Sequence, residues 1–400
     1  MNILFLSIGE FNSLEGGSVH IDVVKQLSIM GHNVHVVCKI ERRNKVNTYL
    51  EELGDIKVLR VKTGNIKNTS IIEKGISTVL LEYQFLSAIK RYFRDVKFDL
   101  VLYHTPPITF TKVIDYIKRR DMAKSYLLLK DIFPQNSVDL GMMKKTGVLY
   151  KYFRWKETLL YQISDRIGCM SQANVRYILD NNPEVDRSKI EICPNSIFIK
   201  DDRITTMDRE MIRLKYNLPT DKKIFVYGGN LGRPQGVDFI IECLKVCSDL
   251  SDVLFLIIGG GTDFYKLENY VEECSPVNVR VMTSLPSLEY ESMVKACDVG
   301  LIFLDNRFTI PNYPSRILSY MQSQMPVFAV TDRNTDIGED IMRGGFGWWC
   351  PSDDSKLFKE MLMQIIEDDL INKGLNAYKY LCKNFDVRIS AKTIEDFIKS

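Results

Sequence analysis

The chain has 400 residues, of which 45% are hydrophobic and 26% charged, and its formal net charge is +2. This composition is typical of globular proteins, and the length favours two or more domains over one. A net charge so close to zero gives no strong field over the whole molecule, so we expect no nucleic-acid partner.

The cysteines and the apolar runs bear on the compartment. Nine cysteines are scattered along the chain without any CxxC pair, and several lie in apolar runs such as "VVCKI" and "RIGCMS". This pattern predicts buried free thiols in a reducing environment. The N-terminus lacks the pattern of a signal peptide, and no apolar run reaches the roughly 18–20 residues that a spanning helix needs. We therefore expect a cytoplasmic protein that touches the inner face of the cell membrane at most peripherally.

The first half of the chain alternates strands and helices. "NILFLSIG" predicts a strand, "EFNSLEGGSVHI" a glycine loop, "HIDVVKQLSIMGH" a helix ending near Gly31, and "NVHVVCKI" the next strand. Such a βαβ unit opens a doubly wound parallel sheet. The strands "IKVLRV", "FDLVLYHTPP", "SYLLLKDIFP", "RIGCMS" and "IEICPNS" continue it, with helices over residues 70–93 and "TKVIDYIKRR". One side of the helix at 70–93 carries the apolar residues Ile72, Ile76, Val79, Leu80, Tyr83, Leu86 and Phe93.

A second series follows a polar linker at residues 198–222, which holds a short helix. Its predicted strands are "KKIFVYGG", "VLFLIIGGG", "VRVMTS", "VGLIFL", "MPVFAV" and "GFGWWC", and helical patterns lie between them. The sequence thus predicts an α/β protein with two Rossmann-like domains facing across a cleft, over residues 1–197 and 198–377. In open α/β sheets ligands bind outside the carboxyl ends of the strands, so we expect the loops there to carry the chemistry.

Two loops of the second domain, and one of the first, suit a phosphate. Arg233 lies in "GGNLGRPQG" with Asn230 and Gly232, and its planar fork suits a diphosphate. The first-domain loop "EGGSVH" allows close backbone approach through Gly16 and Gly17 and could seat a phosphate or a sugar. The second-domain loop "IIGGGTD", with Gly260, could admit a nucleobase or a phosphate. Plain tight turns, with an exposed arginine in the first case, are the alternative interpretation of all three.

"IPNYPSRI" predicts the start of a helix, because Ser315 is a good N-cap residue. Arg316 would then lie in the first turn, near Asn312, and would bracket a diphosphate together with Arg233. Helix capping beside a solvated arginine is the alternative.

In the first half, a charged pair follows the buried run "YLLL" and should emerge at the carboxyl end of that strand. Its members are Lys130 and Asp131, and Asp131 could bind an acceptor hydroxyl and take its proton. His104, at the end of the preceding strand, is a second candidate. A turn-starting aspartate and a structural histidine are the alternatives. The segment 142–157, "MMKKTGVLYKYFRWKE", mixes basic and aromatic residues as membrane-surface segments do, although a helix with one core face would look the same.

Taken together, these segments resemble the GT-B glycosyltransferases of family 4, and most closely the bacterial enzymes that build capsule, O-antigen or exopolysaccharide repeat units. The resemblance covers nearly the whole chain. It lies in "GGSVHIDVVKQLSIMGHNVHVV", "KIEICPNS", "YGGNLGRPQGVDFII", "LFLIIGGG", "SLPSLEYESMVKACDVGLIFL" and "YPSRILSYMQSQMPVFAV".

The resemblance implies a retaining transferase that uses a nucleotide sugar without a tightly bound metal or other cofactor. We expect a UDP-activated, N-acetylated hexose on the second domain and a polyprenyl-diphosphate-linked acceptor on the first. It also implies that residues 378–400 cross back to the first domain. Arg233 and Arg316 would offset the charge of the leaving diphosphate. In a front-face mechanism that phosphate helps to deprotonate the acceptor, and Asp131 orients it.

The chain departs from the family pattern at several positions. Pro311 and Ser319 stand where the family has two glutamates, Gln235 stands near its phosphate-loop lysine, and Lys130 near its histidine. We expect Ser319 and backbone groups of "IIGGG" to hold the ribose. Two other functions fit the same pattern, namely a GT-B sugar-nucleotide epimerase and a non-catalytic GT-B partner subunit.

Overall fold

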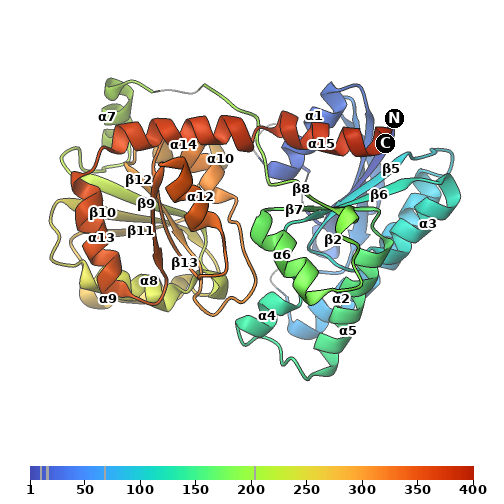
Figure 1. Ribbon diagram of the computed structural model, residues 1–400, viewed down its shortest axis with the longest axis horizontal. Helices are drawn as coiled ribbons and strands as arrows, with labels where there is room; N and C mark the ends of the chain where they lie inside the picture. Colours follow the sequence, from blue (N-terminus) through green and yellow to red (C-terminus); the bar gives the residue numbers. More distant parts are fainter. Residues whose placement is uncertain (10, 15–17, 67–68, 202–203) are drawn as a thin grey trace. The chain divides into compact units, whose positions relative to one another are not determined.

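The computed structural model describes residues 1–9, 11–14, 18–66, 69–201 and 204–400. They form two compact units, one of Met1–Phe198 with Val387–Ser400 and the other of Ile199–Asp386. Each unit is built on one sheet with helices packed against it (Figure 1). The predicted α/β class with two Rossmann-like domains is therefore confirmed.

The first unit has an eight-stranded sheet in the order β3-β4-β2-β1-β5-β6-β7-β8. Every pair is parallel except β3 with β4. The strands are β1 Asn2–Leu6, β2 Asn33–Glu41, β3 Tyr49–Leu53, β4 Ile56–Thr63, β5 Leu100–His104, β6 Lys124–Leu129, β7 Arg166–Cys169 and β8 Ile190–Ile192. The helices are α1 Val19–Ile29, α2 Ile71–Tyr92, α3 Thr111–Asp121, α4 Gln135–Asp139, α5 Val148–Ile163, α6 Gln172–Asn181 and α15 Val387–Lys399, with short 3₁₀ turns η1 Arg42–Asn44 and η2 Arg187–Lys189.

The second unit has a six-stranded parallel sheet in the order β11-β10-β9-β12-β13-β14. Its strands are β9 Lys223–Asn230, β10 Val253–Gly260, β11 Val279–Thr283, β12 Val299–Phe303, β13 Val327–Thr331 and β14 Gly347–Pro351. Its helices are α7 Thr206–Lys215, α8 Val237–Val246, α9 Phe264–Cys274, α10 Ser287–Lys295, α11 Arg316–Gln322, α12 Ile337–Gly344, α13 Ser355–Glu367 and α14 Leu370–Asn384, with the 3₁₀ turn η3 Arg233–Gln235.

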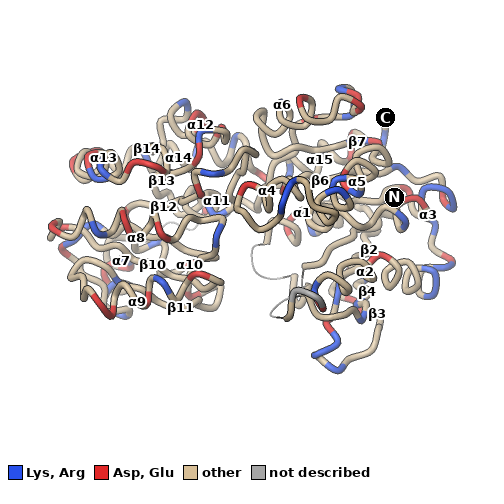
Figure 2. Tube along the Cα trace, turned by 90° about the horizontal axis from the view of Figure 1, so that it is seen from below, with Lys and Arg blue, Asp and Glu red and all other residues tan. Residues whose placement is uncertain are grey.

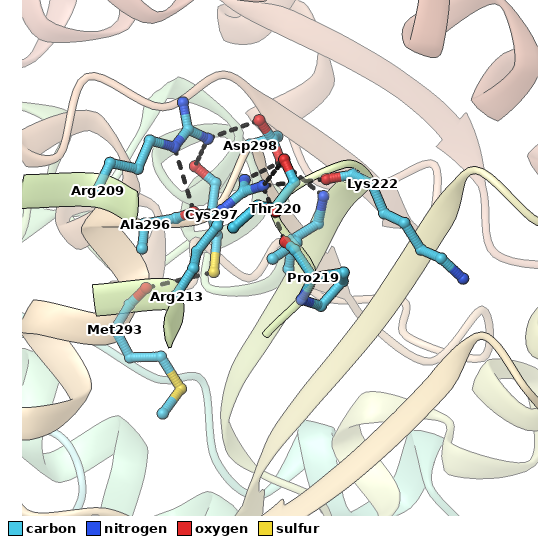
Figure 3. A network of polar contacts seen from close by, with 10 residues as sticks. Arg209, Arg213, Pro219, Thr220, Lys222, Met293, Ala296, Cys297 and Asp298 are labelled. Carbon is cyan, nitrogen blue, oxygen red and sulfur yellow. Dashed lines mark hydrogen bonds and ion pairs between the residues drawn. The ribbon is translucent and has the colours of Figure 1, made fainter. Parts of the chain in front are cut away.

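Apolar runs became central strands because both faces of each sheet are covered. All five residues of β12 and of β13 are buried, for example. β3, "YLEEL", was not predicted because it is a half-exposed, glutamate-rich edge strand, paired antiparallel with β4. The polar linker contains α7, which a capping box of Thr205 and Asp208 begins. Arg213 and Asp298 tie this helix to the second unit (Figure 3).

The C-terminal segment returns to the first unit later than predicted. Residues 378–386 belong to the second unit, because α14 packs on α11 and buries Ala377 and Leu381 there. The return begins at Val387. From there α15 packs on α1 and adds Val387, Ala391 and Ile394 to the core of the first unit (Figure 1).

The cysteines are largely as the sequence indicated. All nine are free, and seven of them are buried, while Cys274 is exposed and Cys382 partly buried. Among the residues that the structure describes, no helix is long and apolar enough to cross a membrane.

Candidate functional site

The strand order places a candidate site in the second unit. The chain passes from β9 to β10 on one side and from β12 to β13 on the other, so the strand order reverses between the neighbours β9 and β12. Sheets of this kind bind ligands in the crevice at the carboxyl ends of the two strands at such a point. The loop after β9 and the segment 304–315 after β12 both reach this end of the sheet. Arg233 lies in the first loop, and Arg316 directly follows the second segment.

Gln235 holds the loop after β9 in shape. Its Oε1 accepts hydrogen bonds from Asn230 Nδ2 at 2.9 Å and from the Gly232 backbone N–H at 3.2 Å, and the side chain is buried. Asn230, predicted to bind the donor, thus uses its amide N–H₂ inside the loop. Gln235, which stands near the position of the family's phosphate-loop lysine, therefore acts as a hydrogen-bond acceptor within the loop.

Two glycines matter here for the space that they leave. Gly261 has φ +154°, and a Cβ on it would lie 2.4 Å from the Leu231 carbonyl oxygen, so only glycine lets the loops after β9 and β10 touch. Gly229 has φ +131°, and a Cβ there would meet the Arg316 guanidinium at 3.4 Å. Gly260 accepts a bond from the Leu231 N–H at 2.9 Å.

Arg316 supplies the strongest sign of a missing ligand. Its guanidinium lies over the ring of Tyr227, with Cζ 4.3 Å from the ring centroid. Its Nη1 is buried without a hydrogen-bond partner, and so is Nδ2 of Asn312 in the preceding segment. A buried donor left unsatisfied costs about 1–3 kcal/mol, and more when charged. An anionic ligand at this point would remove that cost.

Arg233 offers a second cation on the same loop. Its side chain is exposed, four residues beyond Gly229, against which Arg316 lies. Within the described parts of the chain, the Arg233 guanidinium forms no ion pair, whereas the nearby Arg307 pairs with Asp305. Arg233 is therefore available to a ligand from solvent.

Ser315 and Ser319 are placed less favourably than predicted. Ser315 precedes α11, but its side chain makes no capping hydrogen bond and is exposed. Ser319 Oγ donates to the Arg316 carbonyl oxygen at 2.9 Å, one turn back in the same helix. The Ser319 proton is thus committed, and the hydroxyl keeps only its acceptor capacity for a ribose hydroxyl.

In the first unit, His104 lies at the carboxyl end of β5 within a buried polar cluster. Its Nε2 is 2.9 Å from Ser7 Oγ, which follows β1, and its ring stacks on that of His20 at a centroid distance of 4.0 Å. Burial lowers the pKa of His104 to about 4, and burial together with His104 lowers the pKa of His20. Both rings are therefore neutral at pH 7. Gly16 and Gly17, predicted to bind the donor, lie outside the described residues.

Asp131 follows β6 and faces Asn136. The amide of Asn136 donates to both carboxylate oxygens of Asp131 at 3.0 Å, and Thr105 Oγ1 accepts from the Asp131 N–H at 3.1 Å. Burial raises the pKa of this carboxyl group, which makes it a better proton acceptor than a solvated aspartate. Lys130 Nζ donates to the Cys193 carbonyl oxygen at 3.4 Å, and burial lowers its pKa to about 8.

Comparisons with known proteins agree with this geometry. Residues 208–384 match the family described as "Glycosyl transferases group 1". This part of the chain is thus similar to a group 1 glycosyltransferase domain. It contains all the predicted donor-site residues of the second unit, whereas His104 and Asp131 lie outside the match.

Relatives extend the likeness over most of the chain. The probable glycosyltransferase WbjE of Pseudomonas aeruginosa is 25% identical over 80% of this chain and 78% of its own. The putative colanic acid biosynthesis glycosyl transferase WcaI of Escherichia coli K12 is 21% identical over 85% of each. The structure of HepE from Anabaena in complex with UDP-glucose has a TM-score of 0.72 at 15% identity and covers 100% of this chain and 99% of its own. At that identity the last comparison shows the fold, which is GT-B.

Sequence reasoning missed several residues around Arg316 and in the first unit. Tyr227, Ser7 and Thr105 each end or follow an apolar run and looked like ordinary core or turn residues, and His20 looked like the last residue of the loop "EGGSVH". The one available signal for Tyr227 was its place directly before the two glycines of "YGGN". Three or more His, Cys, Asp or Glu side chains arranged to hold a metal are not found in the described parts of the chain.

Proposed function

We propose that the protein transfers a sugar from a UDP-sugar to a lipid-linked saccharide acceptor during synthesis of a bacterial surface polysaccharide such as capsule or O-antigen. The buried, unpartnered Nη1 of Arg316, at the crevice of a glycosyltransferase domain, carries this proposal. A cation with an unused donor suits the diphosphate of a nucleotide sugar.

The donor chemistry rests on two observations. HepE, which shares the fold, was solved with UDP-glucose. Arg316 and Arg233 lie on or against one glycine loop, so both would contact the same diphosphate and offset its charge as the sugar leaves. We assign an N-acetylated hexose to this donor, and no tightly bound metal or cofactor, with the arginines in place of a divalent cation.

The acceptor side belongs to the first unit. Asp131, held by Asn136, would bind the acceptor hydroxyl and orient it. In a retaining reaction the bond from the sugar C1 to the diphosphate oxygen breaks, and the bond to the acceptor oxygen forms on the same face. The acceptor proton passes to the leaving phosphate oxygen, and the arginines stabilise the charge that develops there.

The acceptor class and the compartment follow from the same proposal. WcaI is named for colanic acid biosynthesis, and this relationship supports a polysaccharide role. We propose a polyprenyl-diphosphate-linked acceptor. Because such an acceptor is anchored in a bilayer, the protein would act at the inner face of the cell membrane and contact it through residues 142–157.

The test is transfer of radiolabelled sugar from UDP-GlcNAc, UDP-GalNAc or UDP-glucose to a polyprenyl-diphosphate saccharide by the purified protein. We expect transfer from an N-acetylated donor with the anomeric configuration retained in the product. Asp131→Asn should lower kcat/KM for the acceptor about 100-fold, while the exposed Asp180→Asn on α6 should not. Interconversion of free UDP-sugars without acceptor would indicate an epimerase, and absence of donor binding at millimolar concentration a non-catalytic subunit. Either result would overturn the proposal.

A further inference from the structure

Helix α2 has two apolar faces, and only one of them is buried. The buried face includes Leu81, Phe85, Ala88, Ile89 and Phe93. On the other face, Ile76, Val79, Leu80 and Tyr83 are 41% to 57% exposed. These four residues recur at i, i+3, i+4 and i+7, so they form one stripe along the helix. The apolar side that the sequence pattern indicated is therefore largely the solvent side.

Helix α5 carries a similar exposed stripe in its first two turns. Val148, Leu149 and Trp155 are 83%, 65% and 54% exposed, and Tyr152 lies between them, partly exposed. The opposite face holds Glu157, Leu160 and Tyr161 in the interior. Exposed apolar residues at helical spacing on two helices of one unit are more than scattered single residues.

The two stripes meet across the amino end of α3. Glu82 of α2 pairs with the buried Lys156 of α5 at 3.3 Å and accepts a hydrogen bond from the Lys112 N–H of α3 at 2.6 Å. Lys112, from α3, lies over the Tyr83 ring at 4.2 Å and bonds to its hydroxyl, and the electrostatic neighbours of Tyr152 include Tyr83 and Lys112. Ile76, Val79, Leu80, Tyr83, Val148, Leu149, Tyr152 and Trp155 thus form one surface, which we name the α2–α5 surface.

The exposed charges at the edges of the α2–α5 surface are mainly lysines, and the neighbouring acids Glu73 and Asp115 are paired with Arg42 and Arg119. Lys74, Lys144, Lys145 and Lys151 are exposed at its edges, and Lys112 lies within it. The segment 142–153 contains no Asp or Glu, and in the segment 74–83 the one acid is Glu82, whose carboxylate is buried against Lys156. Figure 2 shows lysines and arginines in blue along α3 and α5.

An open groove continues the same faces of the helices toward their carboxyl ends. It has a volume of about 910 Å³ and is lined from α2, α3 and α5 by residues that include Leu86, Lys112, Tyr116, Arg119 and Leu159. Leu86 and Leu159 follow Tyr83 and Trp155 by three and four residues, so the groove extends both stripes. Its wall combines apolar stems with Lys112, Arg119 and Arg120 and one acid, Asp115, which pairs with Arg119, so cations are in excess, as suits a lipid with an anionic headgroup.

We propose that the α2–α5 surface docks the protein on an anionic lipid bilayer. An apolar stripe inserts between headgroups, aromatic residues at its edge suit the interface, and lysines attract anionic lipid. A second copy of this chain fits less well, because two such surfaces would bring the same lysines together without acids to pair them. The proposal deepens the proposed function, since a lipid-linked acceptor is presented at a bilayer, and it extends the contact from residues 142–157 to α2.

The experiment is sedimentation of the full chain with vesicles of phosphatidylcholine containing 30% phosphatidylglycerol, without donor or acceptor. We expect binding that pure phosphatidylcholine does not support and that high salt weakens. Leu80→Ser/Leu149→Ser should reduce the partition coefficient about tenfold or more. The matched control Val277→Ser/Leu288→Ser, which changes exposed apolar residues of the second unit, should leave it unchanged.

Two charge-reversal double variants test whether the lysines attract anionic lipid. Lys144→Glu/Lys145→Glu should also reduce binding about tenfold or more, while Lys356→Glu/Lys383→Glu makes the same change in net charge without that effect. Vesicles should shift the tryptophan emission of the wild type to the blue, and Trp155→Phe should lose the shift.

Equal vesicle binding by all four double variants would overturn the proposal. A second result would also overturn it. If the wild type binds no vesicles but forms dimers in analytical ultracentrifugation, and Leu80→Ser/Leu149→Ser dissociates these dimers, a second copy of the chain occupies the surface. Transfer activity on a water-soluble acceptor analogue separates the two proposals. Failure of docking leaves that activity intact, and failure of the proposed function leaves vesicle binding intact.

Discussion

The guanidinium of Arg316 lies over the ring of Tyr227, with Cζ 4.3 Å from the ring centroid, and its Nη1 is buried without a hydrogen-bond partner. The ring face attracts the cation, as in other cation–π contacts, and leaves Nη1 without an acceptor. The protein therefore keeps a positioned, desolvated donor group in reserve, which is what recognition of a phosphate requires.

Arg316→Ala should raise KM for the UDP-sugar about 10- to 100-fold, because hydrogen bonds to a charged group contribute about 1.5–3 kcal/mol. The KM of Arg316→Lys for the UDP-sugar should lie between the values of Arg316→Ala and the wild type, since lysine keeps the charge but loses the planar fork and the stack. Steady-state kinetics and donor titration calorimetry measure both effects.

Arg343→Ala is the matched control for Arg316. Arg343 is an exposed arginine of the same unit, at the end of α12 that leads into the amino end of β14, far along the chain from the glycine loops. Its donor KM should equal that of the wild type. Unchanged donor affinity in Arg316→Ala would remove Arg316 from the diphosphate site.

Gln235 gives a prediction that separates loop shape from ligand charge. Gln235→Lys removes an acceptor used by Asn230 Nδ2 and the Gly232 N–H, so the second unit should lose about 1–3 kcal/mol of unfolding free energy. Gln235→Glu keeps the acceptor, and we expect near wild-type stability but weaker donor binding, from a new negative charge beside the diphosphate. Urea unfolding and donor titration give the two readouts. A stable Gln235→Lys protein with tighter donor binding would contradict this role.

Much of the fold could be predicted from the sequence because the central strands are continuous apolar runs between glycine-rich turns. The loops of the candidate site follow from the same pattern, since the carboxyl ends of parallel strands meet at one edge. The return of the chain was predicted too early because α14 is amphipathic in the same way as α15. Only packing decides that Ala377 is buried on α11 in the second unit.

Details that depend on conformation could not be predicted. Helical periodicity showed that Ile76, Val79, Leu80 and Tyr83 share a face, but α2 has a second apolar face, and periodicity does not say which one the sheet covers. The acceptor role of Gln235 exists only in the folded loop. Tyr227 resembled any other aromatic residue of a buried strand until Arg316, 89 positions later in the sequence, was placed on it.

Asp298 is expected to be the main polar anchor of α7. Its carboxylate accepts from Arg213 Nη2 at 2.7 Å, Arg209 Nη2 at 2.6 Å and the Ile224 N–H at 2.6 Å (Figure 3). Asp298→Ala should lower the unfolding free energy of the second unit by about 3–5 kcal/mol, because it leaves the buried Arg213 without its acid.

The control is Asp238→Ala, which breaks the largely exposed pair with Lys266. Surface ion pairs contribute about 0–1 kcal/mol, so that variant should unfold almost as the wild type does. Urea titrations followed by circular dichroism compare the two variants. Equal midpoints would mean that apolar packing alone holds α7 in place.

His104 should make the first unit sensitive to acid. Burial lowers its pKa to about 4 in the folded protein, while its value in the unfolded chain is near the ordinary 6.5. Between these values the unfolded chain binds more protons, so stability rises with pH across the window from 4 to 6.5 and is lost on acidification through it. Through this one group, the unfolding free energy should fall by about 2 kcal/mol between pH 7 and pH 5.

On moving from pH 7 to pH 5, the unfolding free energy of His104→Gln should therefore fall by about 2 kcal/mol less than that of the wild type, whatever the variant's stability at pH 7. Carboxylates contribute equally to both proteins and cancel in the difference. His20→Gln should act in the same direction, because burial and the neighbouring His104 also lower the pKa of His20. Urea unfolding at the two pH values gives the difference, and an NMR titration of the imidazole signals checks the pKa directly. An imidazole of His104 that titrates near pH 6.5 in the folded protein would contradict the buried, neutral stack.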